Sequence, residues 1–225
     1  MARRLLSTAV VVLLTSGCAQ PVPGRPVAGP LPPVPTTHCE YTRDPEATTT
    51  TRVTAPSDDG VPAEGRTALT VKTTRGDLEL TLDAASAPCS VHNFRHLVEQ
   101  RFYEGHSCHR LVTEGIWLIQ CGDPTGTGVG GPGYKYDDPE AAEADYTRGV
   151  IGMANRGTPG TNGSQFFIVY RDSAFPPNFP VIGEVTRGLD VIDKVAAEGV
   201  RPESGLGPTD GLPRLDLKFT KVEEK

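Results

Sequence analysis

The chain has 225 residues, including 25 glycines and 21 prolines, and only 6% of its residues are aromatic. This size and composition suit one compact domain with appended unstructured segments. The formal net charge is −6, and removal of a leader that holds Arg3 and Arg4 lowers it by two, to about −8. Because no basic stripe is available to neutralise phosphates, we expect no nucleic-acid partner.

The first 18 residues have the pattern of an export signal. A basic start, "MARRLL", precedes the apolar run "LLSTAVVVLL", which is too short to span a bilayer, and small residues follow up to Cys18. The stretch "LTSGC" resembles a bacterial lipobox, in which the cysteine is lipidated and becomes the new N-terminus. Thr15 stands where that motif usually has Leu, so cleavage by the general signal peptidase is the alternative. We therefore expect a signal peptide at 1–18 and a lipid anchor at Cys18 on the outer face of the membrane.

Residues 19–66 are rich in Pro, Thr, Ala and charge, as in "PVPGRPVAGPLPPVPTT". Such a segment buries too little apolar surface to offset its ordering entropy, so it is predicted to be a largely disordered tether. The exception is "HCEY", because Cys39 and Tyr41 can pack on the domain. The folded domain is predicted at 67–225.

Short strands dominate this domain. The segments 67–74 and 77–83 alternate apolar and polar residues around "RGD", which is interpreted as a hairpin turn rather than an adhesion motif. Further strands are predicted at 108–112, 117–122, 149–154, 165–170, 181–185 and 214–222. Two helices are predicted, one carrying Val91, Phe94, Leu97 and Val98 on one face, and one carrying Leu189, Ile192, Val195 and Ala196. The fold class is therefore mainly β, with a closed eight-stranded antiparallel barrel capped by two α-helices.

Several motifs occur together in one order. They are the "HNF" helix, "RFYEG", "HR", "QCGD", "GTGVGGPGY", "MAN" and "NGSQFF". With this order and spacing, the region from Thr67 to Val222 resembles the cyclophilin family of peptidyl-prolyl cis-trans isomerases. The resemblance implies a cyclophilin-like fold, proline-containing polypeptides as substrates, and no cofactor.

The resemblance also implies roles for individual residues. Arg110 would stabilise the transition state, Gln120 would orient it, and Phe166 would form the wall of the proline pocket. An isomerase needs no nucleophile or metal; it needs an apolar pocket for the Pro ring and donors aimed at the twisted amide, and Arg offers a permanent charge with a rigid fork of donors. Further substrate-binding positions would be Trp117, Leu118, Ala154, Asn155, Arg156, Gln165, Phe175 and Phe179.

The sequence departs from the family pattern in two places. Nine residues separate Arg110 from Gln120, where common members have seven. The family's ligand-contacting Trp falls near Ala174 or Phe175, so weak cyclosporin binding is expected, and Phe175 and Phe179 could close the pocket instead.

Four cysteines remain after Cys18, at 39, 89, 108 and 121. An even number in an exported chain indicates disulfides, and three pairings are possible. The alternative, a zinc site, lacks any CxxC spacing. His92 and His96 lie one helical turn apart, but no third ligand is near, so no metal is expected.

We therefore predict an isomerase that assists the folding of exported proteins and acts as a monomer. The first alternative is a module on the cell surface that binds proline segments with weak catalysis or as a chaperone. The second is a structural or adhesive surface lipoprotein. Arg110, Gln120 and Phe166 favour the isomerase over the second alternative, but a groove can bind without catalysing.

Overall fold

The computed structural model describes residues 33–139, 141, 145–174, 176, 178–204 and 207–225. Cys18, the predicted signal peptide and the first part of the predicted tether lie outside the described residues. The strands are β1 (Thr36–Thr37), β2 (Tyr41–Arg43), β3 (Val61–Pro62), β4 (Arg66–Thr73), β5 (Gly76–Asp83), β6 (Arg110–Glu114), β7 (Ile116–Cys121), β8 (Tyr134–Tyr136), β9 (Val150–Met153), β10 (Phe166–Val169), β11 (Val181–Arg187), β12 (Asp210–Gly211) and β13 (Phe219–Glu224). The helices are α1 (Pro88–Glu99), α2 (Leu189–Ala197) and the short 3-10 helix η1 (Pro202–Ser204).

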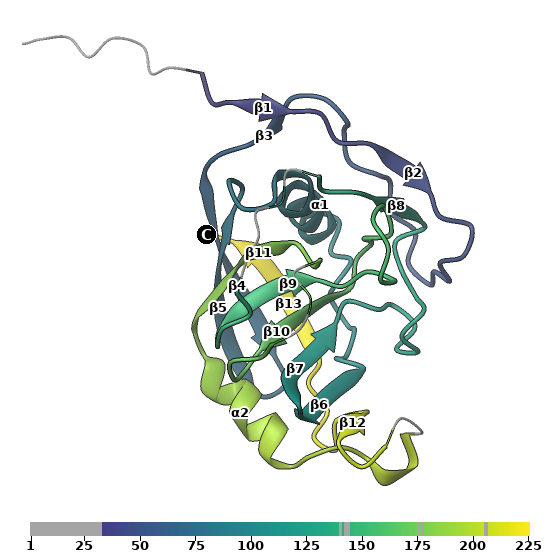
Figure 1. Ribbon diagram of the computed structural model, residues 1–225, viewed down its shortest axis with the longest axis vertical. Helices are drawn as coiled ribbons and strands as arrows, with labels where there is room; N and C mark the ends of the chain where they lie inside the picture. The colour runs from purple at the N-terminus through teal and green to yellow at the C-terminus, as the bar shows by residue number, and fades with distance from the viewer. Residues whose placement is uncertain (1–32, 140, 142–144, 175, 177, 205–206) are drawn as a thin grey trace, which may run out of the picture. The chain divides into compact units, whose positions relative to one another are not determined.

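The main sheet is antiparallel and has nine strands in the order β12-β6-β7-β10-β9-β11-β5-β4-β13 (Figure 1). The prediction of a mainly β fold with two α-helices is confirmed, but the closed eight-stranded barrel is wrong. In the described part of the chain, β12 and β13 are the two ends of the sheet and do not pair with each other. An isolated bridge between Ser107 and Lys218 links the segments that precede β6 and β13, without a ladder that would close the sheet.

The β4–β5 hairpin and α1 supply much of the main core. Apolar residues alternate along both strands, so Leu69, Val71, Leu78, Leu80 and Leu82 face inward and are buried. The predicted turn is confirmed, because Gly76 opens β5 with a φ of 132° that favours glycine.

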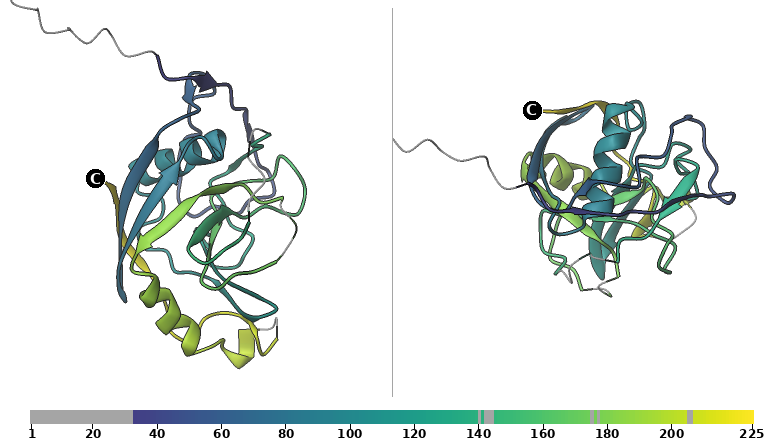
Figure 2. Two further views of the ribbon diagram at one scale, coloured as in Figure 1. Left: turned by 60° about the vertical axis from the view of Figure 1, so that its left-hand side comes forward. Right: turned by 90° about the horizontal axis from the view of Figure 1, so that it is seen from above.

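Both helices turn their predicted faces inward. Val91, Phe94, Leu97 and Val98 of α1 are buried in the main core. Ile192 and Val195 of α2 are also buried there, with Leu189 and Ala196 packed at its edge. In the left view of Figure 2, α1 lies in the upper part of the molecule and α2 in the lower part.

The segment 34–66 is part of the folded unit, which begins at Val34 and not at Thr67. It was expected to belong to the tether. Instead, β1 pairs with β3, and β2 pairs with β8 in the register Tyr41 opposite Tyr136. As the sequence suggested for "HCEY", Cys39 is buried, and the Tyr41 hydroxyl donates a 3.0 Å hydrogen bond to the Cys89 carbonyl.

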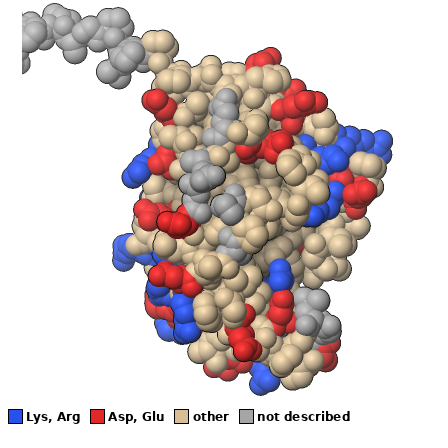
Figure 3. Space-filling view, in the orientation of Figure 1, with Lys and Arg blue, Asp and Glu red and all other residues tan. Residues whose placement is uncertain are grey.

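Two disulfides are present, as the even number of cysteines indicated. Cys39 joins Cys89 and ties the N-terminal segment to α1, while Cys108 joins Cys121 across the β6–β7 hairpin. Among the described residues, no helix is long and apolar enough to cross a membrane. Acidic and basic side chains are interspersed on the face that Figure 3 shows.

Candidate active site

Four adjacent strands place a row of residues on one face of the sheet. Arg110 in β6 is directly opposite Gln120 in β7, Gln120 is opposite Phe167 in β10, and Phe167 is opposite Gly152 in β9. A cation, an amide and an aromatic ring therefore lie side by side, one strand spacing of about 4.8 Å apart at the backbone. The predicted proximity of Arg110 and Gln120 is confirmed.

The aromatic end of this row is an apolar cluster separate from the main core. Its buried members are Val112, Leu118, Tyr146, Phe167 and Val169, and its half-buried members are Ile116, Val150, Ala154, Phe179 and Val181. The Phe167 and Phe179 rings meet edge to face, with centroids 5.8 Å apart. Gly152 leaves room for the first ring, since a Cβ there would lie 2.4 Å from the Phe167 Cζ.

Phe166 does not belong to this cluster, so its predicted place in the proline pocket is corrected. It is 1% exposed and packs in the main core against Phe94 and Tyr103 of the α1 region and against Phe219 of β13. Successive residues of a strand point to opposite faces, so its neighbour Phe167 faces the groove. The sequence analysis did not identify Phe167 as a residue of this cluster.

The same alternation along β7 places Trp117 on the face away from the predicted substrate groove. Leu118 is in the apolar cluster as predicted, whereas Trp117 points to the other face of β7, packs at the edge of the main core and lies under the Arg171 guanidinium at 5.1 Å. Phe179 is in the cluster as predicted. Phe175 lies outside the described residues.

Arg110 is fixed by three hydrogen bonds. Its Nε and one terminal nitrogen donate to the two carboxylate oxygens of Asp210 at 2.8 and 2.7 Å, and the other terminal nitrogen donates to the Gln120 Oε1 at 3.4 Å. The Asp210 hydrogen bonds raise the pKa of Arg110 above its ordinary value, against the opposing effect of burial. The guanidinium is therefore charged, half-buried and oriented. The sequence analysis did not identify Asp210.

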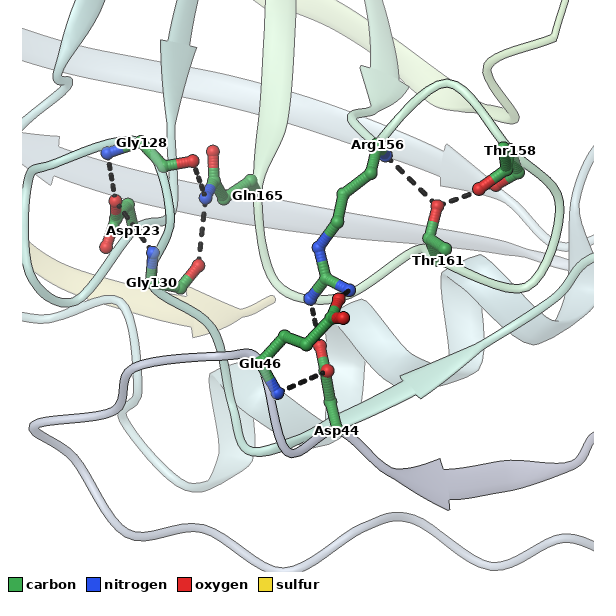
Figure 4. Close-up of polar contacts among 9 residues, drawn as sticks. All are labelled: Asp44, Glu46, Asp123, Gly128, Gly130, Arg156, Thr158, Thr161 and Gln165. Carbon is green, nitrogen blue, oxygen red and sulfur yellow. Dashed lines mark hydrogen bonds and ion pairs between the residues drawn. The ribbon is translucent and has the colours of Figure 1, made fainter.

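Arg110, Gln120 and Gln165 together form a row of polar side chains, called the polar row below. Gln120 Nε2 donates to the Gln165 Oε1 at 2.7 Å. Gln165 Nε2 in turn donates to the carbonyls of Gly128 and Gly130 (Figure 4). Gln165 thus lies beside Gln120, as the predicted groove requires, and joins this row to the 123–131 loop.

Asp123 holds that loop together. Its carboxylate accepts hydrogen bonds from the backbone N–H and the hydroxyl of Thr125. It also accepts from the backbone N–H groups of Gly128 and Gly130 (Figure 4). Burial acts to raise the pKa of Asp123, but these hydrogen bonds outweigh it, and the pKa lies below its ordinary value. Asp123 is therefore a carboxylate that fixes the position of two glycine carbonyls.

On the other side of the groove, Arg156 is bound by the N-terminal segment. Its two terminal nitrogens pair with Asp44 and with Glu46, the latter at 2.9 Å, and the Glu46 N–H donates to Asp44 at 3.1 Å (Figure 4). The Asp44 side chain is 3% exposed, while the Arg156 side chain is 40% exposed.

A pocket of about 90 Å³ lies between Arg156 and the polar row. Gln120, Gln165 and Ala154 line it on the sheet side, and Asp44 and Ala47 line it from the N-terminal segment.

Asn155 borders the same pocket, but its side chain is engaged within the protein. Its Nδ2 donates to the Asn178 carbonyl at 3.0 Å, and its Oδ1 accepts from the Gly157 N–H at 2.9 Å. The predicted groove residues Ala154, Asn155, Arg156 and Gln165 are thus brought together.

Histidines and acids do not form a metal site in the described part of the chain, where no group of three or more potential ligands is close enough to hold an ion. His96 Nε2 contacts the Thr54 carbonyl at 2.8 Å, and His92 lies 3.5 Å from the Ser57 hydroxyl. Both histidines contact the N-terminal segment.

The fold agrees with the comparisons to known proteins. Residues 68–217 match the family model "Cyclophilin type peptidyl-prolyl cis-trans isomerase/CLD". The probable peptidyl-prolyl cis-trans isomerase B of Mycobacterium tuberculosis is 37% identical over 215 residues, which cover 87% of this chain and 68% of that protein.

Solved structures are similar as well. A cyclophilin type peptidyl-prolyl cis-trans isomerase from Cryptosporidium parvum superimposes with a TM-score of 0.61 at 27% identity, over 72% of this chain and 98% of that one. Its structure in the presence of the dipeptide Ala-Pro gives a TM-score of 0.58 at 28% identity, over 69% of this chain and 96% of that one. The chain belongs to the cyclophilin type peptidyl-prolyl cis-trans isomerase family, and its enzyme class is isomerase.

Proposed function

We propose that the groove binds an extended polypeptide, places a proline ring on the apolar cluster and turns the Xaa-Pro bond by means of Arg110. The observation that carries this proposal is the row of Arg110, Gln120 and Phe167 on adjacent strands. A proline ring resting on Phe167 has its preceding carbonyl within reach of donors one or two strands away.

The chemistry requires little more than this arrangement. Rotation about the amide bond has a barrier of about 18–20 kcal/mol, because the resonance between nitrogen and carbonyl is lost at the twisted geometry. In that geometry the amide nitrogen regains its lone pair and becomes an acceptor. A fixed guanidinium donates to it more strongly than to the planar amide, and only such differential binding speeds the reaction.

Gln120 orients Arg110 in this proposal. Its Oε1 accepts from Arg110, and its Nε2 is held by Gln165, so the amide cannot rotate freely. Gln120 therefore helps to keep the guanidinium in one plane beside the peptide.

We also propose that the protein acts on exported polypeptides while attached to the outer face of the cell membrane through Cys18. The leader pattern at 1–18 supports export, and the two disulfides suit an oxidising compartment. Labelling cells with a radioactive fatty acid should mark the parent and not Cys18→Ala. Equal labelling of both, or of neither, would contradict a lipid anchor at this cysteine.

A binding module with weak turnover is the second candidate, and one observation favours it. Asp210 already accepts two hydrogen bonds from Arg110, and this reduces the net charge that the cation presents to a peptide. Such a protein would still hold proline segments in the groove.

One experiment separates the two candidates. The isomerisation rate of a short Xaa-Pro peptide is measured with the oxidised chain from Ala19, and with Arg110→Ala, Phe167→Ala and the control Arg148→Ala. Arg148 forms a similar ion pair with Asp193, away from the polar row.

For an isomerase we expect acceleration by the parent and by the control, and a loss of about 10²-fold in Arg110→Ala. If the folded parent binds the peptide, as chemical-shift changes would show, but does not accelerate isomerisation, the binding module replaces the enzyme.

A further inference from the structure

Asp210 is the closest charged neighbour of the cation on which the proposed mechanism depends. Both of its carboxylate oxygens bind Arg110, in the side-on geometry that uses Nε and one terminal nitrogen. The Arg110 side chain is 35% exposed and that of Asp210 is 28% exposed, so the pair is partly shielded from water. Charge-assisted bidentate pairs of this kind fix orientation as well as distance.

A short strand positions the Asp210 carboxylate. Asp210 belongs to β12, which pairs with β6 in the register Asp210 opposite Val112 and Gly211 opposite Leu111. The Thr113 N–H donates to the Thr209 carbonyl at 2.8 Å, and the Thr113 hydroxyl donates to the same carbonyl. β12 is thus attached to the strand that carries Arg110.

The segment on the far side of β12 is anchored as well. Arg201 donates from its backbone N–H to the Leu212 carbonyl at 2.7 Å and from its Nε to the Pro213 carbonyl at 3.1 Å. The chain on each side of Asp210 is therefore hydrogen-bonded to the rest of the protein. An exposed ion pair on the protein surface would not need its backbone fixed in this way.

A count of donors shows what this pairing leaves for a substrate. A guanidinium has five N–H groups; Asp210 occupies two and Gln120 occupies one, so two remain. The remaining two are on the terminal nitrogens. Because the planar group is held through its Nε edge, these donors have a fixed direction.

We propose that Asp210 is a positioning residue for catalysis, which locks the Arg110 guanidinium so that its two remaining N–H groups point at the twisted amide. This inference rests on the proposed isomerase function. Asp210 does not touch the substrate; it acts through Arg110. The pairing helps catalysis because an unrestrained Arg side chain would lose rotamer freedom when it binds the twisted amide, whereas a guanidinium held by Asp210 is already ordered.

The test compares Asp210→Ala and Asp210→Asn with the parent, each alone and combined with Arg110→Ala. Asp193→Ala is the control, because Asp193 also forms a bidentate pair with an arginine, in this case through the two terminal nitrogens of Arg148. We expect Asp210→Ala to lower kcat on the order of tenfold at an unchanged KM. Asp210→Glu, which can re-form the bidentate pair, should recover part of the loss, and Asp193→Ala should lose nothing.

The double variant distinguishes positioning from a structural role. If Asp210 acts through Arg110, Asp210→Ala causes no further loss in the Arg110→Ala background. The same loss in both backgrounds would overturn the inference, and so would a faster reaction, since the carboxylate would then restrain the cation rather than orient it. If Arg110→Ala retains full activity, the proposed mechanism through Arg110 is contradicted, whatever the Asp210 variants show.

A spectroscopic measurement keeps the inference testable if Asp210→Ala folds poorly. The Arg110 Nε–H signal in nitrogen-15 NMR should exchange slowly with water in the parent and fast in Asp210→Asn. Unchanged exchange in Asp210→Asn would overturn the inference, because Asp210 would then not hold this edge of the guanidinium.

Discussion

The two sides of the groove are built alike but use their arginines differently. On one side, Asp210 binds Arg110 through Nε and one terminal nitrogen, which leaves two N–H groups free of partners among the described residues. On the other side, Asp44 and Glu46 occupy both terminal nitrogens of Arg156. Arg110 is thus paired with one carboxylate and Arg156 with two, so the Arg156 side has a net negative charge that the Arg110 side lacks.

Each side also has its own disulfide. Cys108–Cys121 joins the strands that carry Arg110 and Gln120, and Cys39–Cys89 anchors the segment that carries Asp44. In the proposed mechanism, catalysis depends on the Arg110 side, and the Arg156 side shapes the groove. Changes made on one side should therefore affect activity or stability separately from the other, unless the two sides are coupled.

Removal of Cys39–Cys89 should have the largest effect on stability. The bridge closes a loop with a sequence separation of 50, and the chain-entropy model gives about 4 kcal/mol for a loop of this length. Urea unfolding of Cys39→Ser/Cys89→Ser, followed by the fluorescence of Trp117, measures this loss. At low temperature, where the variant is folded, kcat should stay near that of the parent. A large fall in kcat would show that the N-terminal segment controls Arg110.

Removal of Cys108–Cys121 should cost less stability and more activity. Its sequence separation is 13, which gives about 3 kcal/mol in the same model. Arg110 and Gln120 lie within two residues of these cysteines, so a looser hairpin should misplace the guanidinium and lower kcat. The activity of Cys108→Ser/Cys121→Ser, measured where most molecules are folded, checks this expectation. Unchanged kcat would mean that Asp210 and the β6–β7 ladder suffice to hold Arg110.

Much of the fold could be predicted from local pattern, but the two acids that complete these pairs could not. Alternation predicts β4 and β5, and helical periodicity predicts α1 and α2, because each signal lies within one segment. Asp210 is 100 residues from Arg110, and Asp44 is 112 residues from Arg156. Asp210 stands in the Gly- and Pro-rich stretch "GLGPTDGLP" and Asp44 in "YTRDPE", and neither stretch carries a local sign of such a partner.

The errors inside the site have a different origin. Phe166 and Trp117 were each assigned to the groove, yet alternation within their strands places Phe167 and Leu118 there. The period of two was available in the sequence, since Gln165 and Phe167 must share a face. The N-terminal segment was missed for another reason: β1, β2 and β3 have two or three residues each, and the segment is held by a disulfide and by pairing with distant strands.

Asp44→Ala should have the next largest effect on stability. A hydrogen bond to a charged group contributes about 1.5–3 kcal/mol, and Asp44 is buried at the point where it meets Arg156. Urea unfolding should show a loss in this range, while Asp193→Ala should lose less because its pair is more exposed.

In Asp44→Ala, Arg156 keeps one acidic partner instead of two, so peptides with an acidic residue near the proline should be turned over better relative to neutral ones. An unchanged preference would show that Arg156 does not face the bound peptide.

Acidification should weaken the loop that lies between the two sides. The pKa of Asp123 is lowered in the folded chain relative to 3.8, so its carboxylate stabilises the fold at pH values above its unfolded pKa. This contribution is lost as the pH falls through the lower folded value. Stability measured by urea unfolding from pH 5 downward should therefore fall less steeply in Asp123→Asn than in the parent. Parallel curves would mean that Asp123 does not titrate with unfolding.

Glu46→Gln should have the smallest effect and tests whether the Arg156 side depends on Asp44 alone. The Glu46 side chain is 74% exposed, whereas that of Asp44 is 3% exposed, although both bind the same guanidinium. Exposed ion pairs contribute about 0–1 kcal/mol, because water and salt screen them and ordering two long side chains costs entropy. Urea unfolding should therefore barely separate Glu46→Gln from the parent, and the difference should vanish at high salt. A loss as large as that of Asp44→Ala would mean that the two acids act as one unit, since the Glu46 N–H also donates to Asp44.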